Sequence, residues 1–200
     1  MIKEYFNEKA ATWDEQVSEK DVTKLERMAR RLDIKSGSIV LDVGTGTGVF
    51  LPFLSSRVGD SGQIVAIDFA EEMLKVAGAK CFNGNVCYLC ADVGDIPRDN
   101  ETFDSVVCYS SFPHFQDKLR ALAEIFRVTR SGGRLFICHT SSRDEINEIH
   151  RQIPVVQNDI IPDADEMRAL LTTAGFIDIK IEDDEESYFS SARKPLGGAA

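Results

Sequence analysis

The sequence has no long hydrophobic run and no surplus of positive charge. No stretch of the 200 residues approaches the roughly 18 consecutive apolar residues that a membrane-spanning helix needs. The early lysine is not followed by the apolar run of a signal peptide. With 23 Lys and Arg against 33 Asp and Glu, the net charge is −10, whereas nucleic acids and anionic membranes bind clustered Lys and Arg. We therefore expect no nucleic acid and no membrane as partner, and a small molecule as ligand.

The sequence also lacks an even, regularly spaced set of cysteines. The five cysteines are odd in number and scattered, which indicates reduced thiols in a cytoplasmic protein rather than a disulfide framework. Cys87 and Cys90 have the C-x-x-C spacing of metal and redox pairs, but they lie in a strand pattern, where residues three apart point to opposite faces. We expect these cysteines to pack in the core, and we expect no metal site.

Strand and helix patterns alternate along most of the chain. The first 35 residues have apolar residues at three- and four-residue spacing, as in helices with one apolar face. Short apolar runs then predict strands over residues 38–43, 63–68, 85–92, 103–110, 134–139, 176–182 and 187–194. Helical patterns cover residues 70–80, 117–130, 143–153 and 163–175, and a further helix is expected to begin near Gly48.

Strands that alternate with helices predict βαβ units and a mostly parallel sheet. Only the segment DDEES separates the last two strands, which is too short for a crossover helix, so these two strands must be antiparallel. We predict an α/β fold with a seven-stranded, mostly parallel sheet and an antiparallel C-terminal strand. We expect a single domain over residues 1–200, with a helical cap (1–35), a core (36–194) and a flexible tail (195–200).

The stretch IVLDVGTGTGVFLPFL, residues 39–54, turns through three glycines between a strand pattern and a helix pattern. Gly44, Gly46 and Gly48 let the backbone turn sharply and approach a ligand without Cβ atoms in the way. Amides at the start of the helix attract a pyrophosphate or a carboxylate equally well. The G-x-G-x-G spacing departs from the G-x-G-x-x-G of dinucleotide sites, and Asp42 would repel a pyrophosphate but could hold an α-ammonium group. The loop therefore predicts a zwitterionic ligand.

Two further acids end strand patterns. Asp68 lies 20 residues after Gly48, the distance at which an acid reaches ribose hydroxyls in nucleoside-binding α/β folds. Asp92 ends the next strand and could accept a hydrogen bond from the exocyclic amine of adenine. Each acid alone also fits an ordinary helix cap or loop. Three strand-end acids in register with one glycine loop favour a nucleoside site.

Five segments resemble motifs of the class I S-adenosylmethionine-dependent methyltransferases, of the small-molecule type. They are LDVGTGTG, AIDFAEEML, CADVGDIP, FDSVVCYSSFPHF and LAEIFRVTRSGGRLFI, so the resemblance covers nearly the whole chain. An antiparallel seventh strand is also a hallmark of that family. The resemblance implies a three-layer, Rossmann-like sandwich. It also implies an enzyme that passes the methyl group of S-adenosylmethionine (SAM) to a small-molecule acceptor by in-line displacement and leaves S-adenosylhomocysteine (SAH).

By this resemblance, the donor site consists of residues on the loops after the strands. They are Asp42, Gly44, Thr45, Gly46 and Gly48 at the methionine part, Asp68, Phe69 and Met73 at the ribose and nucleoside, Asp92 and Val93 at the adenine, and Tyr109 beside the donor. The early segment YFNEKAATWD is similar to the family's N-terminal cap. Its aromatic residues Tyr5, Phe6 and Trp13 either close over the donor or pack between helix and core.

The sequence has only three histidines, which are candidates for the acceptor side. His114 follows the fourth predicted strand and His139 ends the fifth, so both lie at the donor edge if these strands are neighbours. His150 lies on or beside the apolar stripe of its predicted helix. The three could act as a general base, as an acceptor-orienting pair or as metal ligands, or they are separate polar residues. Among them we favour His139 as the base, because a strand-end position is fixed by the sheet.

Two other functions fit parts of the sequence. An NAD-dependent oxidoreductase is compatible with the glycine loop and the Asp68 spacing, but Val49, Asp42 and the C-terminal hairpin count against it. A non-catalytic nucleoside-binding module would keep the donor motifs and lack an acceptor pocket. The acceptor has no signature in the sequence, and the segments available for a lid are short, which favours a small molecule. A homodimer is compatible with the sequence.

Overall fold

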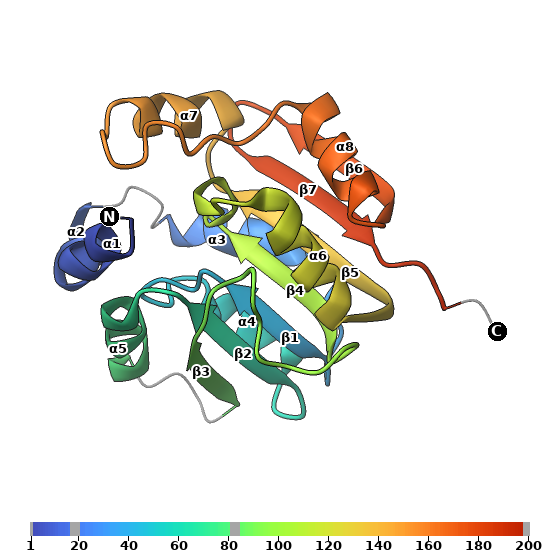
Figure 1. Ribbon diagram of the computed structural model, residues 1–200. Coiled ribbons are helices and arrows are strands. Elements are labelled where there is room, and N and C mark those ends of the chain that lie inside the picture. The colour runs from blue at the N-terminus through green and yellow to red at the C-terminus, as the bar shows by residue number, and fades with distance from the viewer. Residues whose placement is uncertain (1, 17–20, 81–84, 198–200) are drawn as a thin grey trace.

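The described part of the chain forms a seven-stranded sheet between layers of helices (Figure 1). The computed structural model describes residues 2–16, 21–80 and 85–197. The strand order is β3-β2-β1-β4-β5-β7-β6, and β7 runs antiparallel to both of its neighbours. The strands are β1 Ile39–Val43, β2 Gln63–Asp68, β3 Val86–Cys90, β4 Phe103–Tyr109, β5 Thr129–His139, β6 Ile177–Asp183 and β7 Tyr188–Arg193. The predicted fold class is confirmed.

The helices cover both faces of the sheet and one of its edges (Figure 1). Apolar residues of α3 (Val22–Arg31) and α4 (Leu51–Val58) pack on one face, and those of α6 (Lys118–Val128) and α8 (Ala164–Thr173) pack on the other. The N-terminal helices α1 (Ile2–Lys9) and α2 (Trp13–Gln16), joined by a short 3-10 turn, pack on α5 (Glu71–Ala79). Helix α7 (Arg143–Arg151) follows β5. Within the described ranges, no helix is long and apolar enough to cross a membrane.

Two element boundaries differ from the sequence prediction. The helix after the glycine loop begins at Leu51, because Gly48 has a φ of +79° and cannot continue a right-handed helix. Strand β5 begins at Thr129, where the sequence predicts the last turn of a helix, because Thr129 pairs with Phe103 of β4 and extends the sheet. Both are cases in which tertiary pairing or a turn overrides a local periodicity.

The expectation of core cysteines is wrong for Cys87 and Cys90, which are both exposed. Strand β3 lies at the edge of the sheet and pairs only with β2, so none of its residues is fully buried. Cys108 and Cys138 are buried in the central strands, as expected. Cys81 lies outside the described residues, as do residues 17–20 of the predicted cap and 198–200 of the predicted tail.

The carboxyl ends of four strands lie together on one side of the sheet. Strand β1 pairs in parallel with β2 on one side and with β4 on the other, and β4 pairs in parallel with β5. The chain order of the strands therefore reverses at β1, and the carboxyl ends of β1, β2, β4 and β5 open on the same side. Such a switch point is where open α/β sheets bind ligands.

The first loop at this edge passes very close to the loop after β4. Gly44 has a φ of +70°, and a Cβ added to it would lie 2.4 Å from the Cβ of Ser111. The Ser111 hydroxyl donates a 2.6 Å hydrogen bond to the carbonyl of Val43. The protein itself, before any ligand is considered, thus requires glycine at position 44.

We expect the substitution Gly44→Ala to lower the free energy of unfolding by at least about 2 kcal/mol, because it combines backbone strain with a steric overlap. Urea denaturation of the purified variant measures this. Gly78→Ala is the matched control, because Gly78 lies in α5 with no heavy atom within 4 Å of its added Cβ, and alanine favours helix by up to about 1 kcal/mol. Equal stability of the two variants would contradict the packing described.

Candidate active site

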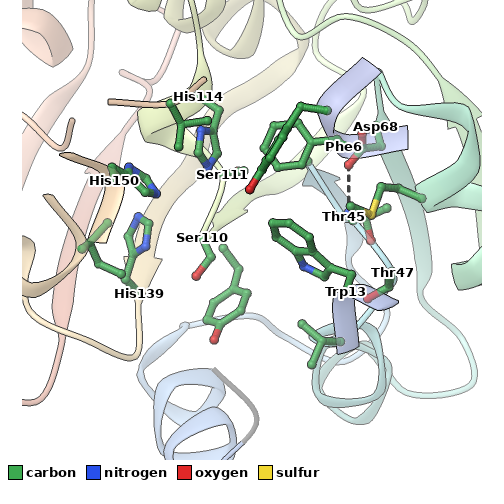
Figure 2. Close-up of a pocket in the computed structure, with 18 of the residues that line it drawn as sticks. Phe6, Trp13, Thr45, Thr47, Asp68, Ser110, Ser111, His114, His139 and His150 are labelled. Atoms are coloured by element: carbon green, nitrogen blue, oxygen red, sulfur yellow. Dashed lines mark hydrogen bonds between the residues drawn. The ribbon is translucent and has the colours of Figure 1, made fainter. Parts of the chain in front are cut away.

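A cavity of about 370 Å³ opens at the carboxyl ends of β1, β2, β4 and β5 (Figure 2). Thr45 and Thr47 of the glycine loop lie on one side of it together with Asp68, and the three histidines lie on the other. Of the residues predicted for the site, the lining includes Gly44, Thr45, Gly46, Asp68, Phe69, Met73, Tyr109, His114, His139 and His150. The structure thus brings together in one cavity residues from strands and loops that are far apart in sequence.

Four predicted donor residues do not line this cavity. Asp42 is buried beneath the glycine loop, and Gly48 does not line the cavity although its neighbours Thr47 and Val49 do. Asp92 is exposed and accepts a 2.7 Å hydrogen bond from the amide of Gly94, and Val93 packs against the core. Their roles toward a ligand remain predictions from the family resemblance.

Asp68 fixes the glycine loop from the end of β2. One carboxylate oxygen accepts a hydrogen bond from the amide of Gly46 (2.9 Å), and the other accepts one from the amide of Ala70 (2.8 Å). Burial raises the pKa of Asp68, and these two amides and the nearby His114 partly offset that rise. The carboxylate still has lone pairs free to accept from a ligand, because each oxygen can take more than one hydrogen bond.

The backbone at Gly46 faces open space. Its φ is +54°, and an added Cβ would meet no heavy atom within 4 Å. Unlike Gly44, this glycine is not needed to avoid a clash within the protein. A ligand can therefore approach the main chain beside Asp68.

Asp42 carries the strongest electrostatic perturbation of the acids in this region. Its side chain is fully buried, and burial raises its pKa to about 7, with a further rise from Asp68 and an opposing effect of the Thr45 hydroxyl. Near neutral pH this acid is therefore divided between its neutral and ionised forms. A cation that binds nearby would favour the ionised form.

The N-terminal helices close one wall of the cavity. The ring of Phe6 lies 5.8 Å from that of Phe69 and 5.1 Å from that of His114, measured between centroids. Asp14 ties this cap to the glycine loop by accepting a 2.6 Å hydrogen bond from the Thr47 hydroxyl, and it also forms a 2.6 Å ion pair with Lys80. Phe6 is buried against α5 and also lines the cavity, and a role of the cap aromatics over a donor stays a prediction.

The three histidines differ in their surroundings. His139 ends β5 as predicted and is fully buried, and burial together with His114 and His150 lowers its pKa to about 3. At neutral pH it is an uncharged and very weak base, so the electrostatics do not favour it in that role. Burial and His114 also lower the pKa of His150.

His114 is held by a carboxylate. Its Nδ1 lies 2.9 Å from Oδ2 of Asp159, and its ring lies 4.8 Å from that of His150. The Nδ1 of His150 makes a hydrogen bond with the main-chain carbonyl of the same Asp159. Sequence reasoning missed Asp159, because it lies in an irregular segment with no motif.

Sequence reasoning also missed Ser110, which lies between the two sides of the cavity (Figure 2). It follows β4 with a φ of +50°, a strained conformation for a serine. Its hydroxyl is buried and has no hydrogen-bond partner among the described residues. The only sequence signal is a serine pair after a strand, which is too common to be specific.

Aliphatic side chains form the rest of the histidine side. They come from α7 and the segment that follows it, and they are Ile146, Ile149, Ile153 and Val156, with Phe115 beside them. This part of the cavity suits a molecule with a large apolar surface and a few polar atoms. Within the described residues, no group of three or more His, Cys, Asp or Glu side chains could hold a metal ion.

Comparisons with known proteins agree with one another. A model of the methyltransferase domain matches residues 41–137. The ubiquinone/menaquinone biosynthesis C-methyltransferase of Marinomonas sp. is 30% identical over 165 residues, which are 77% of this chain and 64% of that protein. The demethylmenaquinone methyltransferase of Staphylococcus carnosus is 29% identical over 182 residues, covering 78% and 75%. This chain thus spans less than two thirds of the first relative.

A solved structure is similar as well. A SAM-dependent methyltransferase structure from Aquifex aeolicus is 27% identical, with a TM-score of 0.72 over 87% of this chain and 94% of that one.

The buried Asp42 predicts a pH-dependent stability. Its pKa in the folded state is about 7, well above the usual aspartate value of the unfolded chain. The folded state therefore favours the protonated form of Asp42, and the free energy of unfolding falls as the pH rises toward 7. An asparagine side chain at this position does not titrate. We therefore expect the stability of Asp42→Asn relative to the natural chain to increase by about 2–3 kcal/mol between pH 5 and pH 8.

Urea denaturation at the two pH values measures this difference. Asp60→Asn is the control, because Asp60 is exposed, and its stability difference should not change with pH. If Asp42→Asn and Asp60→Asn show the same pH dependence, Asp42 is ionised in the folded protein at pH 5 as well as at pH 8.

Proposed function

This chain belongs to the family of class I SAM-dependent methyltransferases, and from this membership and its cavity we propose that it methylates a small, largely apolar acceptor. One observation carries the proposal most directly. The side formed by Asp68 and Gly46 and the side formed by the histidines are parts of one cavity. A methyl donor on the first side and an acceptor on the second would meet within it.

The donor is proposed to lie along the glycine loop. The Asp68 carboxylate would accept hydrogen bonds from the ribose hydroxyls, and the main chain at Gly46 would contact the methionine part. The buried Asp42 would stabilise the α-ammonium group from beneath the loop. When bound, SAM supplies a methyl group already activated by a sulfonium, so the protein's main task is alignment and exclusion of water.

The rest of the predicted donor site is retained as part of this proposal. Phe69, Met73 and Tyr109 line the cavity where a nucleoside would lie. Asp92 and Val93 are kept as adenine contacts on the family resemblance alone. The cap over residues 1–35 is proposed to shield the donor within a single cytoplasmic domain.

The acceptor is proposed to be the reduced form of a quinone-like ring. The two relatives carry the names of quinone-pathway methyltransferases. In this chain, aliphatic side chains would cover an apolar ring or tail, while Ser110 and the histidines would face ring hydroxyls. Removal of a hydroxyl proton makes the adjoining ring carbon nucleophilic, and imidazole is a suitable base for that proton.

Donor binding tests the first half of the proposal. We expect SAH to bind the natural chain, and Asp68→Asn to weaken the affinity about 10- to 100-fold, because charge-assisted hydrogen bonds are lost. Titration calorimetry measures both, with Asp60→Asn as the control that keeps full affinity. Binding of NADH in place of SAH would favour an oxidoreductase and contradict the proposed donor.

Turnover tests the second half. With methyl-labelled SAM, we expect transfer of label to a short-chain naphthoquinol or benzoquinol under reducing conditions. The corresponding quinone should receive none, because it has no hydroxyl proton to lose. Mass spectrometry of the organic extract identifies the product. SAH binding with no transfer to any quinol would argue for a different acceptor class or for a non-catalytic binding module.

A further inference from the structure

Asp159 is the residue that joins two of the cavity histidines, and no sequence motif points to it. It lies between α7 and α8, and its side chain is largely buried. Its carboxylate is hydrogen-bonded to Nδ1 of His114 at 2.9 Å, and its main-chain carbonyl is hydrogen-bonded to Nδ1 of His150. Asp159 thus binds Nδ1 of both histidines, one through its carboxylate and the other through its main-chain carbonyl.

The segment that carries Asp159 is irregular but firmly held. Asn147, buried in α7, donates to the carbonyl of Ile161 (3.1 Å) and accepts from the amide of Ile161 (2.8 Å). The amide of Asp159 donates to the carbonyl of Val156 at 2.8 Å. These bonds fix the backbone on both sides of Asp159, so its carboxylate has a defined position relative to His114.

Both partners on Asp159 are acceptors, which determines where the histidine hydrogens lie. A carbonyl oxygen and a carboxylate can only accept, so Nδ1 of each ring carries the hydrogen. In the neutral ring, the lone pair is then on Nε2. A carboxylate at Nδ1 also stabilises the positive ring that forms when Nε2 takes up a proton.

Charged groups reach His114 from several elements. Asp68 interacts with it from β2, His139 from β5 and His150 from α7. Lys118 of α6 interacts with Asp159 from the other side. The uncharged ring of Phe6 from α1 packs against the ring of His114. Carboxylates of two different segments, Asp159 and Asp68, thus interact with His114.

We infer that Asp159 is a positioning residue that makes His114, rather than His139, the proton acceptor of the proposed methyl transfer. The inference rests on the proposed function. Nε2 of His114 takes the proton of the acceptor, whose electron pair forms the new bond to the methyl carbon while the carbon–sulfur pair leaves on sulfur. The positive charge passes from the sulfonium to the imidazolium beside Asp159, so charge is conserved within the cavity.

Nitrogen-15 NMR of the histidine rings tests this inference without turnover. The chain has only three histidines, so single His→Gln variants assign every ring signal. In the natural chain we expect His114 to carry its hydrogen on Nδ1 when neutral. In Asp159→Asn we expect the His114 titration midpoint to fall, because the negative charge at Nδ1 is gone. A neutral His114 with its hydrogen on Nε2 in the natural chain overturns the inference, even if the variant fails to fold.

The pH profile of turnover gives the second readout. We expect Asp159→Asn to lower kcat about 10-fold or more, to move the acidic limb of the kcat profile with the His114 midpoint, and to leave SAH affinity unchanged. Asp163→Asn is the matched control, because Asp163 is an exposed N-cap of α8 and asparagine caps equally well. Thermal unfolding of both variants checks their fold.

The outcomes separate this inference from the proposed function. If SAH binds and quinols are methylated, but Asp159→Asn changes neither the His114 titration nor the pH profile, the positioning role is wrong and the proposed function stands. If SAH does not bind, the proposed function fails, whatever the ring signals show. If the ring signals respond but kcat falls equally in Asp163→Asn, the loss of activity is structural and the positioning role of Asp159 in turnover is wrong.

Discussion

The carbonyl oxygen of Ile67 accepts hydrogen bonds from the amides of both Gly44 (2.8 Å) and Thr45 (3.0 Å). These two bonds draw the loop after β1 across the end of β2, where Asp68 binds the amide of Gly46. On the other side, Ser111 binds the carbonyl of Val43. The loop is therefore fixed to both neighbouring strands, and every other feature of the cavity is placed relative to it. The two bonds to Ile67 are backbone contacts and depend on the parallel register of β1 with β2. The other two bonds also require the side chains of Asp68 and Ser111.

Burial shifts the ionisable groups of this region toward their neutral forms. It raises the pKa of Asp42 and Asp68 and lowers the pKa of His139 and His150. The protein thus has a poorly solvated cavity in which a ligand's positive charge, close to the two acids, would be stabilised strongly. This explains why carboxylates lie beneath and beside the glycine loop, where a pyrophosphate would instead be repelled. The same low solvation makes the position of each hydrogen on the imidazoles significant.

The sequence predicts the parts of this structure that depend on local patterns and misses those that depend on packing between distant segments. Alternating strand and helix patterns and the short DDEES connection were sufficient for the sheet and its antiparallel end. Asp68 and the glycine loop were found because strand ends are recognisable. The exposure of Cys87 and Cys90 was not predictable, because the position of β3 at the sheet edge is a property of strand order. Likewise, His139 is fixed by the sheet as expected, yet its deep burial, which removes its basicity, has no sequence signal.

Two segments without a place in the sheet enclose the cavity, and each contributes one acid that binds residues of the cavity wall. In the N-terminal cap, Asp14 binds Thr47 of the glycine loop and Lys80 after α5. In the segment after α7, Asp159 binds the two histidines. The ion pair of Asp14 with Lys80 is partly exposed and contributes little to stability, so it matters mainly because it selects one geometry for the cap. Asp159 and His114 are largely buried, and their segment is also held by Asn147. The cap acid acts on the donor side and the α7 acid on the acceptor side. The two covering segments therefore contact different halves of the cavity. A change in one acceptor-side residue can alter proton transfer while the donor loop keeps its geometry.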